Sequence, residues 1–336
     1  MTTVSLVGAA SYMPETVIPN SFFQQVNEGE FHPMFRGTRE RRHVSAEESA
    51  VDMMVKACEK LKANLNLDLA KDADILLTNV TVLDMPFTGM GAELAHRLGM
   101  KPQWNIDMHN GGCVSFVFMM DLARALMRSS GAKTAIICNV SNAGGRIFNH
   151  PITKTMPQAA IPGDGCGVGY LVANDQSPIR SIVRHCYGEY ARDMSAVSDD
   201  GQPWWAPRTT PMYIEFTESK LASVVSRANR IMPAAMNEAI AQADMTSQDI
   251  HKLFTNQPNR VFLRNWREAI RLKEGGHIHT FPQYGNLFGA GIPVSLAHAI
   301  ENGLIQKGEN LLLGGFAHAG DYAGAAVVQW GGGAST

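Results

Sequence analysis

Two stretches of the chain follow the same order of elements, and this repeat constrains the fold more than any other feature. In the first stretch, a glycine turn and a helical pattern precede GAKTAIICNVSNAGG (131–145) and GDGCGVGYLVAN (163–174). The second runs through YGNLFGAGIPVSLAHAIENGLIQ (284–306), KGENLLLGGFAHAG (307–320) and DYAGAAVVQWG (321–331). Two such halves would bring their helix starts together at one site. Chance similarity between ordinary strand–helix–strand units explains the same pattern.

Strand-like and helix-like segments alternate along the first half. TVSLVGAA (3–10), ADILLTNV (73–80) and QWNIDMH (103–109) predict strands, and AVDMMVKACEKLKANL (50–65) and AELAHRLGM (92–100) predict helices. The alternation predicts a mainly parallel sheet covered by helices. We expect a link at 173–177 between halves 1–175 and 176–336, and a long loop or cap at 199–211.

Composition excludes several classes of function. The 336 residues are 45% hydrophobic and 18% charged, with a net charge of -2, so no basic field favours nucleic acid or anionic membranes. No apolar run approaches the roughly 20 residues of a membrane helix, and the first residues lack a basic leader. Five widely spaced cysteines without a CxxC pair indicate a reducing, cytoplasmic setting and no disulfide framework.

Cys113 follows two glycines and directly precedes a helical pattern formed by Phe116, Met120, Ala123 and Met127. In the first turn of a helix, unpaired N–H groups and the helix dipole would lower the pKa of the thiol. A thiolate that attacks a thioester, with N–H groups holding the oxyanion, is the machinery of acyl transfer. The alternative is that Cys113 is a small buried apolar residue.

Ordered motifs along nearly the whole chain resemble the ketoacyl synthase III enzymes (FabH type) of the thiolase superfamily. They are VGAASYMPETVIPN, RGTRERRHVSAEESAVDMMVKA, NGGCVSF, PGDGCGVGYLV, FTNQPNRVF, YGNLFGAGIPVSLAHAI and LLLGGFAHAGDYAGAAVVQW. The resemblance implies an α/β thiolase-like fold, two duplicated halves in a five-layered α/β/α/β/α arrangement. It also implies a homodimer, and it accounts for the internal repeat.

The resemblance further implies a cysteine–histidine–asparagine site. Cys113 takes the position of the nucleophile and Asn286 that of the asparagine, but Asn256 stands where the family has its histidine. Backbone N–H groups of Cys113 and Ala319 would bind the thioester oxygen. An asparagine amide donates a hydrogen bond to an oxyanion, but it takes no proton, so the usual general base is missing.

Three functions are compatible with an asparagine, Asn256, at the position of the family's histidine. The protein passes an acyl group from Cys113 to a non-malonyl acceptor, which suggests specialised metabolism. Alternatively, it performs a decarboxylative Claisen condensation with a malonyl thioester, with two asparagines stabilising the enolate. Or it is a non-catalytic subunit of a heterodimeric synthase, which the retention of Cys113 and Asn286 argues against.

Another histidine of the chain could act as the general base in place of the family's catalytic histidine. His318 lies where the family has a run of glycines facing the oxyanion, which makes it the best candidate, although a structural role is the commoner one for a histidine. His109, His277 and His279 are weaker candidates. The pair His277-x-His279 is too small for a metal site, so we predict no metal.

Substrate contacts follow from the same resemblance. No cofactor is bound permanently, and the donor is an acyl-CoA or acyl-phosphopantetheine thioester. Arg36 corresponds to an arginine that contacts the CoA nucleotide, and Phe31 or Phe35 would replace the tryptophan that stacks on the adenine in the family. Phe87, with Met85 and Met90, lies where the family lines the acyl pocket from the partner subunit. Trp204 and Trp205 either cap an entrance or lie in the core. A basic helical face with Arg260, Arg264, Arg267 and Arg271 is either solvated or a docking surface for an acidic carrier protein.

Overall fold

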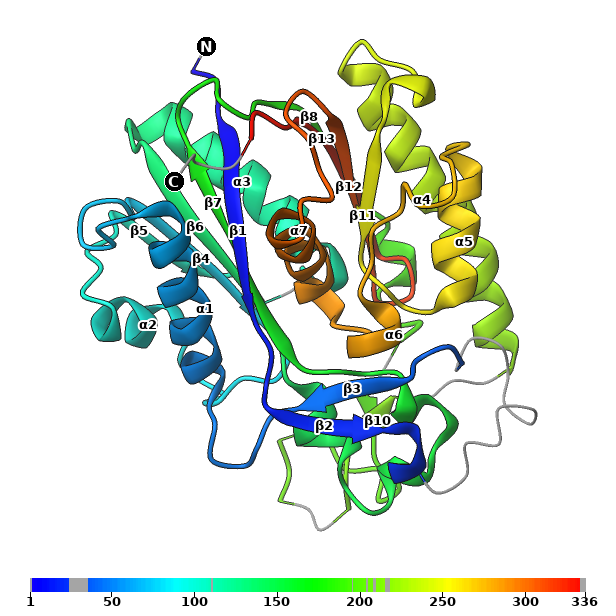
Figure 1. Ribbon diagram of the computed structural model, residues 1–336. Helices are drawn as coiled ribbons and strands as arrows, with labels where there is room; N and C mark the ends of the chain where they lie inside the picture. The colour runs from blue at the N-terminus through cyan, green and yellow to red at the C-terminus, as the bar shows by residue number, and fades with distance from the viewer. Residues whose placement is uncertain are drawn as a thin grey trace.

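Two sheets and three layers of helices form the frame of the fold in this computed structural model, which describes residues 2–23, 36–109, 111–194, 196–203, 205–207, 210–214 and 218–332. Helices α3 (Ser115–Ser130) and α7 (Gly291–Glu301) lie between the sheets (Figure 1). Helices α1 (Ala50–Leu65) and α2 (Gly91–Arg97) cover one outer face, and α4 (Glu218–Gln242) and α5 (Arg260–Ala269) cover the other. The predicted five-layered α/β/α/β/α arrangement is confirmed.

The first sheet has the strand order β1-β7-β6-β4-β5. These strands are β1 (Ser5–Tyr12), β7 (Gly165–Val172), β6 (Thr134–Ser141), β4 (Ile75–Val80) and β5 (Trp104–Asp107). Strand β4 is parallel to β5 and β6, whereas β7 is antiparallel to both β1 and β6. Since β1, β6, β4 and β5 all run in one direction, the prediction of a mainly parallel sheet holds except at β7. The chain returns from β6 to β7 through turns and not through a crossover helix, which reverses the strand direction.

The second sheet repeats this pairing pattern. Its order is β11-β12-β13-β8, formed by β11 (Lys252–Thr255), β12 (Asn310–Ala317), β13 (Tyr322–Gln329) and β8 (Ile179–Cys186). Strand β11 is parallel to β12, and β13 is antiparallel to β12 and β8. A single parallel bridge between Leu253 and His277 stands where β5 would have its counterpart. The repeat in the sequence is thus a structural duplication.

Three apolar cores hold the layers together. The central core joins Leu77 and Ile137 of the first sheet, Phe116 of α3, Ile292 of α7 and Leu313 of the second sheet. A second core lies under α1 and α2, and a third under α4 and α5. Strand β4 is buried along its whole length, as expected for a strand covered on both faces.

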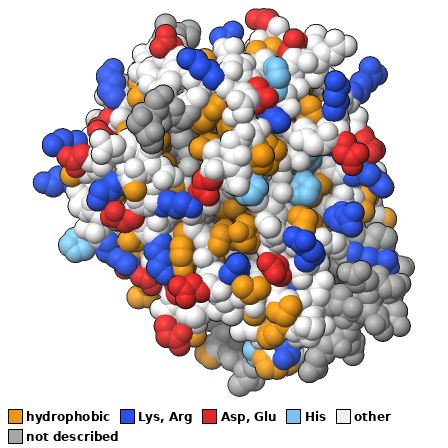
Figure 2. Space-filling model, in the orientation of Figure 1, with side chains coloured by type: hydrophobic (Ala, Val, Ile, Leu, Met, Phe, Trp, Pro, Cys, Tyr) orange, Lys and Arg blue, Asp and Glu red, His pale blue; other side chains and the backbone are white. Residues whose placement is uncertain are grey.

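The remaining elements lie around these layers. They are β2 (Thr16–Pro19), β3 (Glu40–His43), β9 (Ala196–Val197), β10 (Tyr213–Ile214) and the short helix α6 (Phe281–Tyr284). The link predicted at 173–177 lies between β7 and β8, where the chain leaves the first sheet for the second. In Figure 2 acidic and basic side chains are interspersed on the visible face, without a field of one sign.

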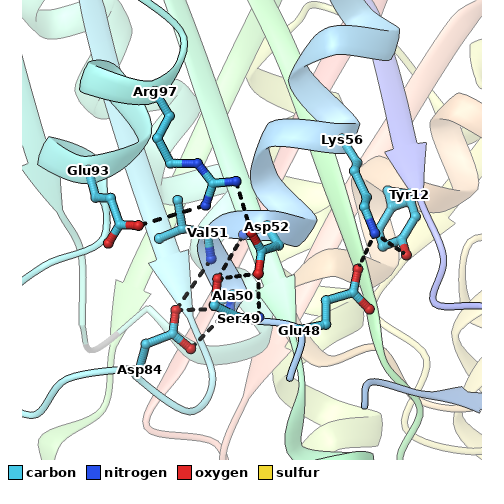
Figure 3. Close-up of polar contacts among 10 residues, drawn as sticks. All are labelled: Tyr12, Glu48, Ser49, Ala50, Val51, Asp52, Lys56, Asp84, Glu93 and Arg97. Carbon is cyan, nitrogen blue, oxygen red and sulfur yellow. Dashed lines mark hydrogen bonds and ion pairs between the residues drawn. The ribbon is translucent and has the colours of Figure 1, made fainter. Parts of the chain in front are cut away.

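The N-terminus of α1 anchors the loop that carries Phe87 (Figure 3). The side chain of Ser49 caps the helix in a capping box with Asp52. From the neighbouring loop, the Asp84 carboxylate accepts hydrogen bonds from the N–H groups of Ala50, at 2.9 and 3.0 Å, and of Val51, at 3.3 Å. A carboxylate at this position satisfies helix N–H groups and complements the helix dipole.

Replacing Asp84 with alanine is therefore expected to lower the free energy of unfolding by about 1 kcal/mol. Urea denaturation of the two proteins measures the difference. Glu93→Ala is the control, because the 3.7 Å contact of Glu93 with Arg97 is an exposed ion pair and contributes little. Equal losses in both variants would contradict the anchoring role of Asp84.

Candidate active site

Cys113 lies in a 3₁₀ turn, Gly112–Val114, that directly precedes α3. The predicted place in the first turn of the helix is therefore wrong, since α3 begins two residues later. Gly289, in the turn before α7, packs against this turn, and a Cβ there would meet the carbonyl oxygen of Gly112 at 2.7 Å. The predicted meeting of the two helix starts is thus confirmed, with Cys113 at their contact.

The environment of Cys113 keeps its thiol protonated. Burial raises the pKa of Cys113 to about 12, and the Asp321 carboxylate adds to the rise. Hydrogen bonds from the Asn256 side chain and the His318 backbone N–H act in the opposite direction without offsetting the burial. The expected lowering of this pKa by the helix start is wrong, because the loss of hydration outweighs the dipole.

Alkylation measures this protonation state directly. Below its pKa, the thiolate fraction of Cys113 grows about tenfold per pH unit. We expect slow labelling of Cys113 by iodoacetamide at pH 7 and a steep rise towards pH 10, followed by peptide mapping. The exposed Cys186 is the internal control for reagent access. Rapid labelling of Cys113 at pH 7 without a rise would contradict a raised pKa.

Asn256 follows β11 and is clamped to the backbone of β12. Its Nδ2 group donates to the carbonyl oxygen of Phe316 at 3.1 Å, and its Oδ1 accepts from the Phe316 N–H at 3.0 Å. A hydrogen bond from the Asn256 side chain also acts to lower the pKa of the Cys113 thiol. Asn256 is thus fixed to the β12 backbone by its acceptor and its donor, beside the nucleophile.

Asn286 follows α6 and reaches the site from the other side. Its Oδ1 accepts from the Phe288 N–H at 3.0 Å, which leaves Nδ2 as the amide group able to donate to a substrate. Its backbone N–H donates to the Ile161 carbonyl at 2.7 Å, and its carbonyl accepts from Gly163 at 3.0 Å. The PGDG and YGN motifs are therefore held together by paired backbone.

The loop after β12 brings His318 and Asp321 to the same place. His318 has a left-handed backbone (φ +48°), and its Nδ1 lies 2.8 and 2.9 Å from the two carboxylate oxygens of Asp321. A Cβ on Gly112 would lie 2.8 Å from His318 Nε2, so this nitrogen faces the nucleophile turn. Ala319 is buried and its carbonyl accepts from Arg227. The backbone N–H of the preceding residue, His318, acts to lower the pKa of the Cys113 thiol.

These residues share a largely apolar cavity of about 470 Å³. Cys113, Asn256, Asn286, His318 and His109 line it together with apolar side chains that include Phe148, Ile161, Met194, Val224, Phe262 and Phe316. Such a cavity suits an acyl chain with its reactive end at the thiol.

Several predicted residues lie outside the cavity. Phe87 is 96% exposed, Met85 is also exposed and Met90 is buried. Arg36 does not line it, and Phe31, Phe35 and Trp204 lie outside the described residues, whereas Trp205 is exposed and not in the core. His277 contacts the Thr255 hydroxyl and the Leu263 carbonyl, and burial lowers its pKa to about 3. His279 likewise does not line the cavity.

The arginines of α5 differ in their contacts. Arg260 and Arg264 are exposed, and Arg267 pairs with Glu268 at 3.4 Å and with Glu274 at 3.8 Å. Among the described residues no three histidine, cysteine or acidic side chains form a group able to hold a metal. No helix in the described part of the chain is long and apolar enough to cross a membrane.

Asp321 is the site residue that sequence reasoning missed. Its spacing of three residues from His318, in a glycine-flanked turn, was the available indication. The resemblance related His318 to the site of Cys113, but nothing in the sequence alone gave Asp321 a place beside it.

Comparisons with known proteins agree with this architecture. Residues 240–330 match the family described as 3-Oxoacyl-[acyl-carrier-protein (ACP)] synthase III C terminal. The chain is 26% identical over 330 residues to a β-ketoacyl-[acyl-carrier-protein] synthase III of Staphylococcus saprophyticus, covering 98% of this chain and 99% of the relative.

Solved structures of related enzymes share the fold of this chain. The synthase III of Thermus thermophilus superposes with a TM-score of 0.82 at 26% identity, covering 98% of this chain and 99% of that one. The priming β-ketosynthase of a polyketide biosynthetic pathway superposes with a TM-score of 0.84 at 19% identity, covering 98% and 97%. The chain therefore has the thiolase fold and is similar to the β-ketoacyl synthases III along its whole length, with the family match itself at residues 240–330.

Proposed function

We propose that the protein takes an acyl group from an acyl-CoA or acyl-carrier-protein thioester onto Cys113 and passes it to an acceptor other than malonyl. The observation that carries this proposal is the thiol of Cys113, partly exposed to a largely apolar cavity of about 470 Å³. The acyl thioester is a substrate, and the proposal needs no permanently bound cofactor.

The hydrogen bonds of Asn256 favour acyl transfer over condensation. A malonyl enolate needs donors aimed at its oxygen as charge develops there. The Asn256 amide is held by Phe316 through both its donor and its acceptor, and it acts to lower the pKa of the Cys113 thiol, so we assign this side chain to the nucleophile and not to an enolate site. Asn286 and the backbone N–H groups of Cys113 and Ala319 are then the proposed oxyanion donors.

Two partners belong to the proposal. An acidic carrier protein would dock on α5 through Arg260, Arg264 and Arg267, where two of the three arginines are exposed. A second copy of the chain would cover Phe87, whose loop is anchored by Asp84 at α1 and leaves the ring 96% exposed. Arg36 is the proposed contact for a CoA nucleotide.

Intact-protein mass tests the proposal. The protein and Cys113→Ala are incubated briefly with acetyl-, hexanoyl-, decanoyl- and malonyl-CoA. We expect a mass gain equal to one acyl group that is absent in the alanine variant. Malonyl arriving as acetyl would support the condensing alternative, and no adduct from any CoA or carrier thioester would support a non-catalytic subunit.

A further inference from the structure

We propose that His318 and Asp321 form a proton-transfer pair for Cys113, and that the acyl acceptor is consequently a hydroxyl or amine compound. The inference rests on the proposed acyl-Cys113 function and extends it to the base and to the chemistry of the acceptor. It assigns His318 as the general base and Asp321 as its positioning residue.

The geometry of the pair is that of an oriented imidazole. Asp321 is 7% exposed, and both of its carboxylate oxygens lie within 2.9 Å of His318 Nδ1. A carboxylate there fixes the tautomer with the proton on Nδ1, which leaves Nε2 as the acceptor. Nε2 faces the Gly112–Cys113 turn, and His318 lines the same cavity as Cys113.

Residues of α4 and of the segment after β8 hold the loop that carries His318 and Asp321. Arg227 of α4 donates to the carbonyl of Ala319 and pairs with Asp193 at 2.7 Å. The N–H of Tyr187 donates to the Asp321 carbonyl at 2.7 Å. His318 keeps a left-handed backbone that costs free energy for a residue with a side chain. A merely structural turn would favour glycine here, so the retained imidazole points to chemistry.

The chain needs such a base. The thiol of Cys113 is protonated in its resting state, and Asn256 takes no proton. In the first step, Nε2 would accept the Sγ proton while sulfur attacks the thioester carbonyl carbon. The bond from that carbon to the donor's sulfur then breaks, and the leaving thiolate takes the proton from Nε2. Acyl-Cys113 and a free donor thiol result, with His318 neutral again.

The second step defines the acceptor. Nε2 would take the proton of an O–H or N–H group as its oxygen or nitrogen attacks the acyl carbon. The bond to Cys113 Sγ breaks, and the thiolate recovers that proton. A malonyl thioester needs no such base, because loss of carbon dioxide generates its carbanion directly. An alcohol, an amine or water does need a base in this second step, and the base that serves acylation of Cys113 is in place to serve it again.

Single-turnover kinetics test the pair. Acylation by saturating hexanoyl-CoA, or by the acyl-CoA that loads best, is followed by mass, and hydrolysis of the acyl-enzyme is followed after CoA removal. We expect His318→Gly to slow both steps by about 10²–10⁴-fold, and Asp321→Asn to slow them by a smaller factor. Glycine adopts the left-handed backbone of residue 318 without strain. The variant therefore removes the imidazole while the loop keeps its conformation.

Further readouts exclude a purely structural role. Added imidazole should partly restore His318→Gly. Without the base, acylation in that variant should follow the thiolate fraction of Cys113 and therefore depend on pH more steeply than in the native protein. The charged and titratable groups near His318 are Cys113, Asp321, Arg227, His109 and Tyr322. His185→Gln is the matched control, since His185 pairs with Glu238 at 2.7 Å outside the cavity.

The outcomes separate the two proposals. If His318→Gly is acylated on Cys113 and hydrolysed at the native rates, His318 is not the general base, and the proposed acyl transfer through Cys113 still stands. Transfer to ethanolamine in the native protein supports the acceptor class, whereas a 3-oxoacyl product from malonyl-CoA as the main product would overturn it. A native protein that acquires no acyl group contradicts the proposed function and the inference together. If His318→Gly fails to fold, unchanged rates in Asp321→Asn would overturn the pair.

Discussion

Replacing Gly163 with alanine is expected to destabilise the protein by about 3 kcal/mol or more. A Cβ at this position would lie 1.9 Å from the carbonyl oxygen of Tyr284, which is backbone and cannot rotate away. The two segments are fixed against each other by the hydrogen bonds between Asn286 and Ile161 and between Gly163 and Asn286. Separating them would displace Asn286 from the cavity, so acylation of Cys113 should fall with stability.

Chemical denaturation compares this variant with Gly188→Ala. Gly188 lies in a turn where an added Cβ meets nothing within 4 Å, so the same substitution should change the free energy of unfolding little. Equal denaturation midpoints for Gly163→Ala and the parent would show that the two motifs separate without cost, contrary to the paired backbone.

Asn256→Asp is expected to impair both folding and chemistry. The new carboxylate keeps an acceptor for the Phe316 N–H, but it places a second oxygen against the Phe316 carbonyl and the Cys113 sulfur. An unpaired buried acceptor and charge should cost about 2–4 kcal/mol of stability. Loss of the donor to sulfur should slow acylation by about 10²-fold.

Thermal melting and the acylation rate, measured on the same samples, test this expectation. Asn259→Asp is the matched control, because Asn259 is also buried at the cavity but caps α5 through a bond to the Phe262 N–H. Aspartate is as good a helix cap as asparagine, so the melting temperature and acylation rate of Asn259→Asp should remain close to those of the parent protein. Equal losses in both variants would contradict the clamp at Phe316.

The resemblance to the ketoacyl synthase III enzymes predicted the five layers, whereas local patterns predicted only a sheet covered by helices, because burial determines which faces need cover. The apolar face of α1 and the apolar start of β4 (Ile75, Leu76 and Leu77) both require cover. The direction of β7 was not predictable, because it depends on whether the connection from β6 contains a crossover helix. Strand direction is a property of connections that hydrophobic periodicity does not encode.

The site was predicted in its residues more than in its chemistry. Cys113, Asn256, Asn286 and His318 do line one cavity. The raised pKa of Cys113 was missed because burial by distant segments outweighs the local helix start. The clamp on Phe316 was missed because it joins residues 60 positions apart. Both errors come from contacts that only the assembled sheets create.

The contact between the two helix starts also explains why a duplicated chain has one nucleophile. A side chain on Gly289 would meet Ser115 Oγ at 2.5 Å and the Gly112 carbonyl at 2.7 Å. Two equivalent turns that touch have room for a side chain on only one of them. After a duplication, steric exclusion at this point would force the copies to diverge, one keeping the thiol and the other supplying groups that serve it.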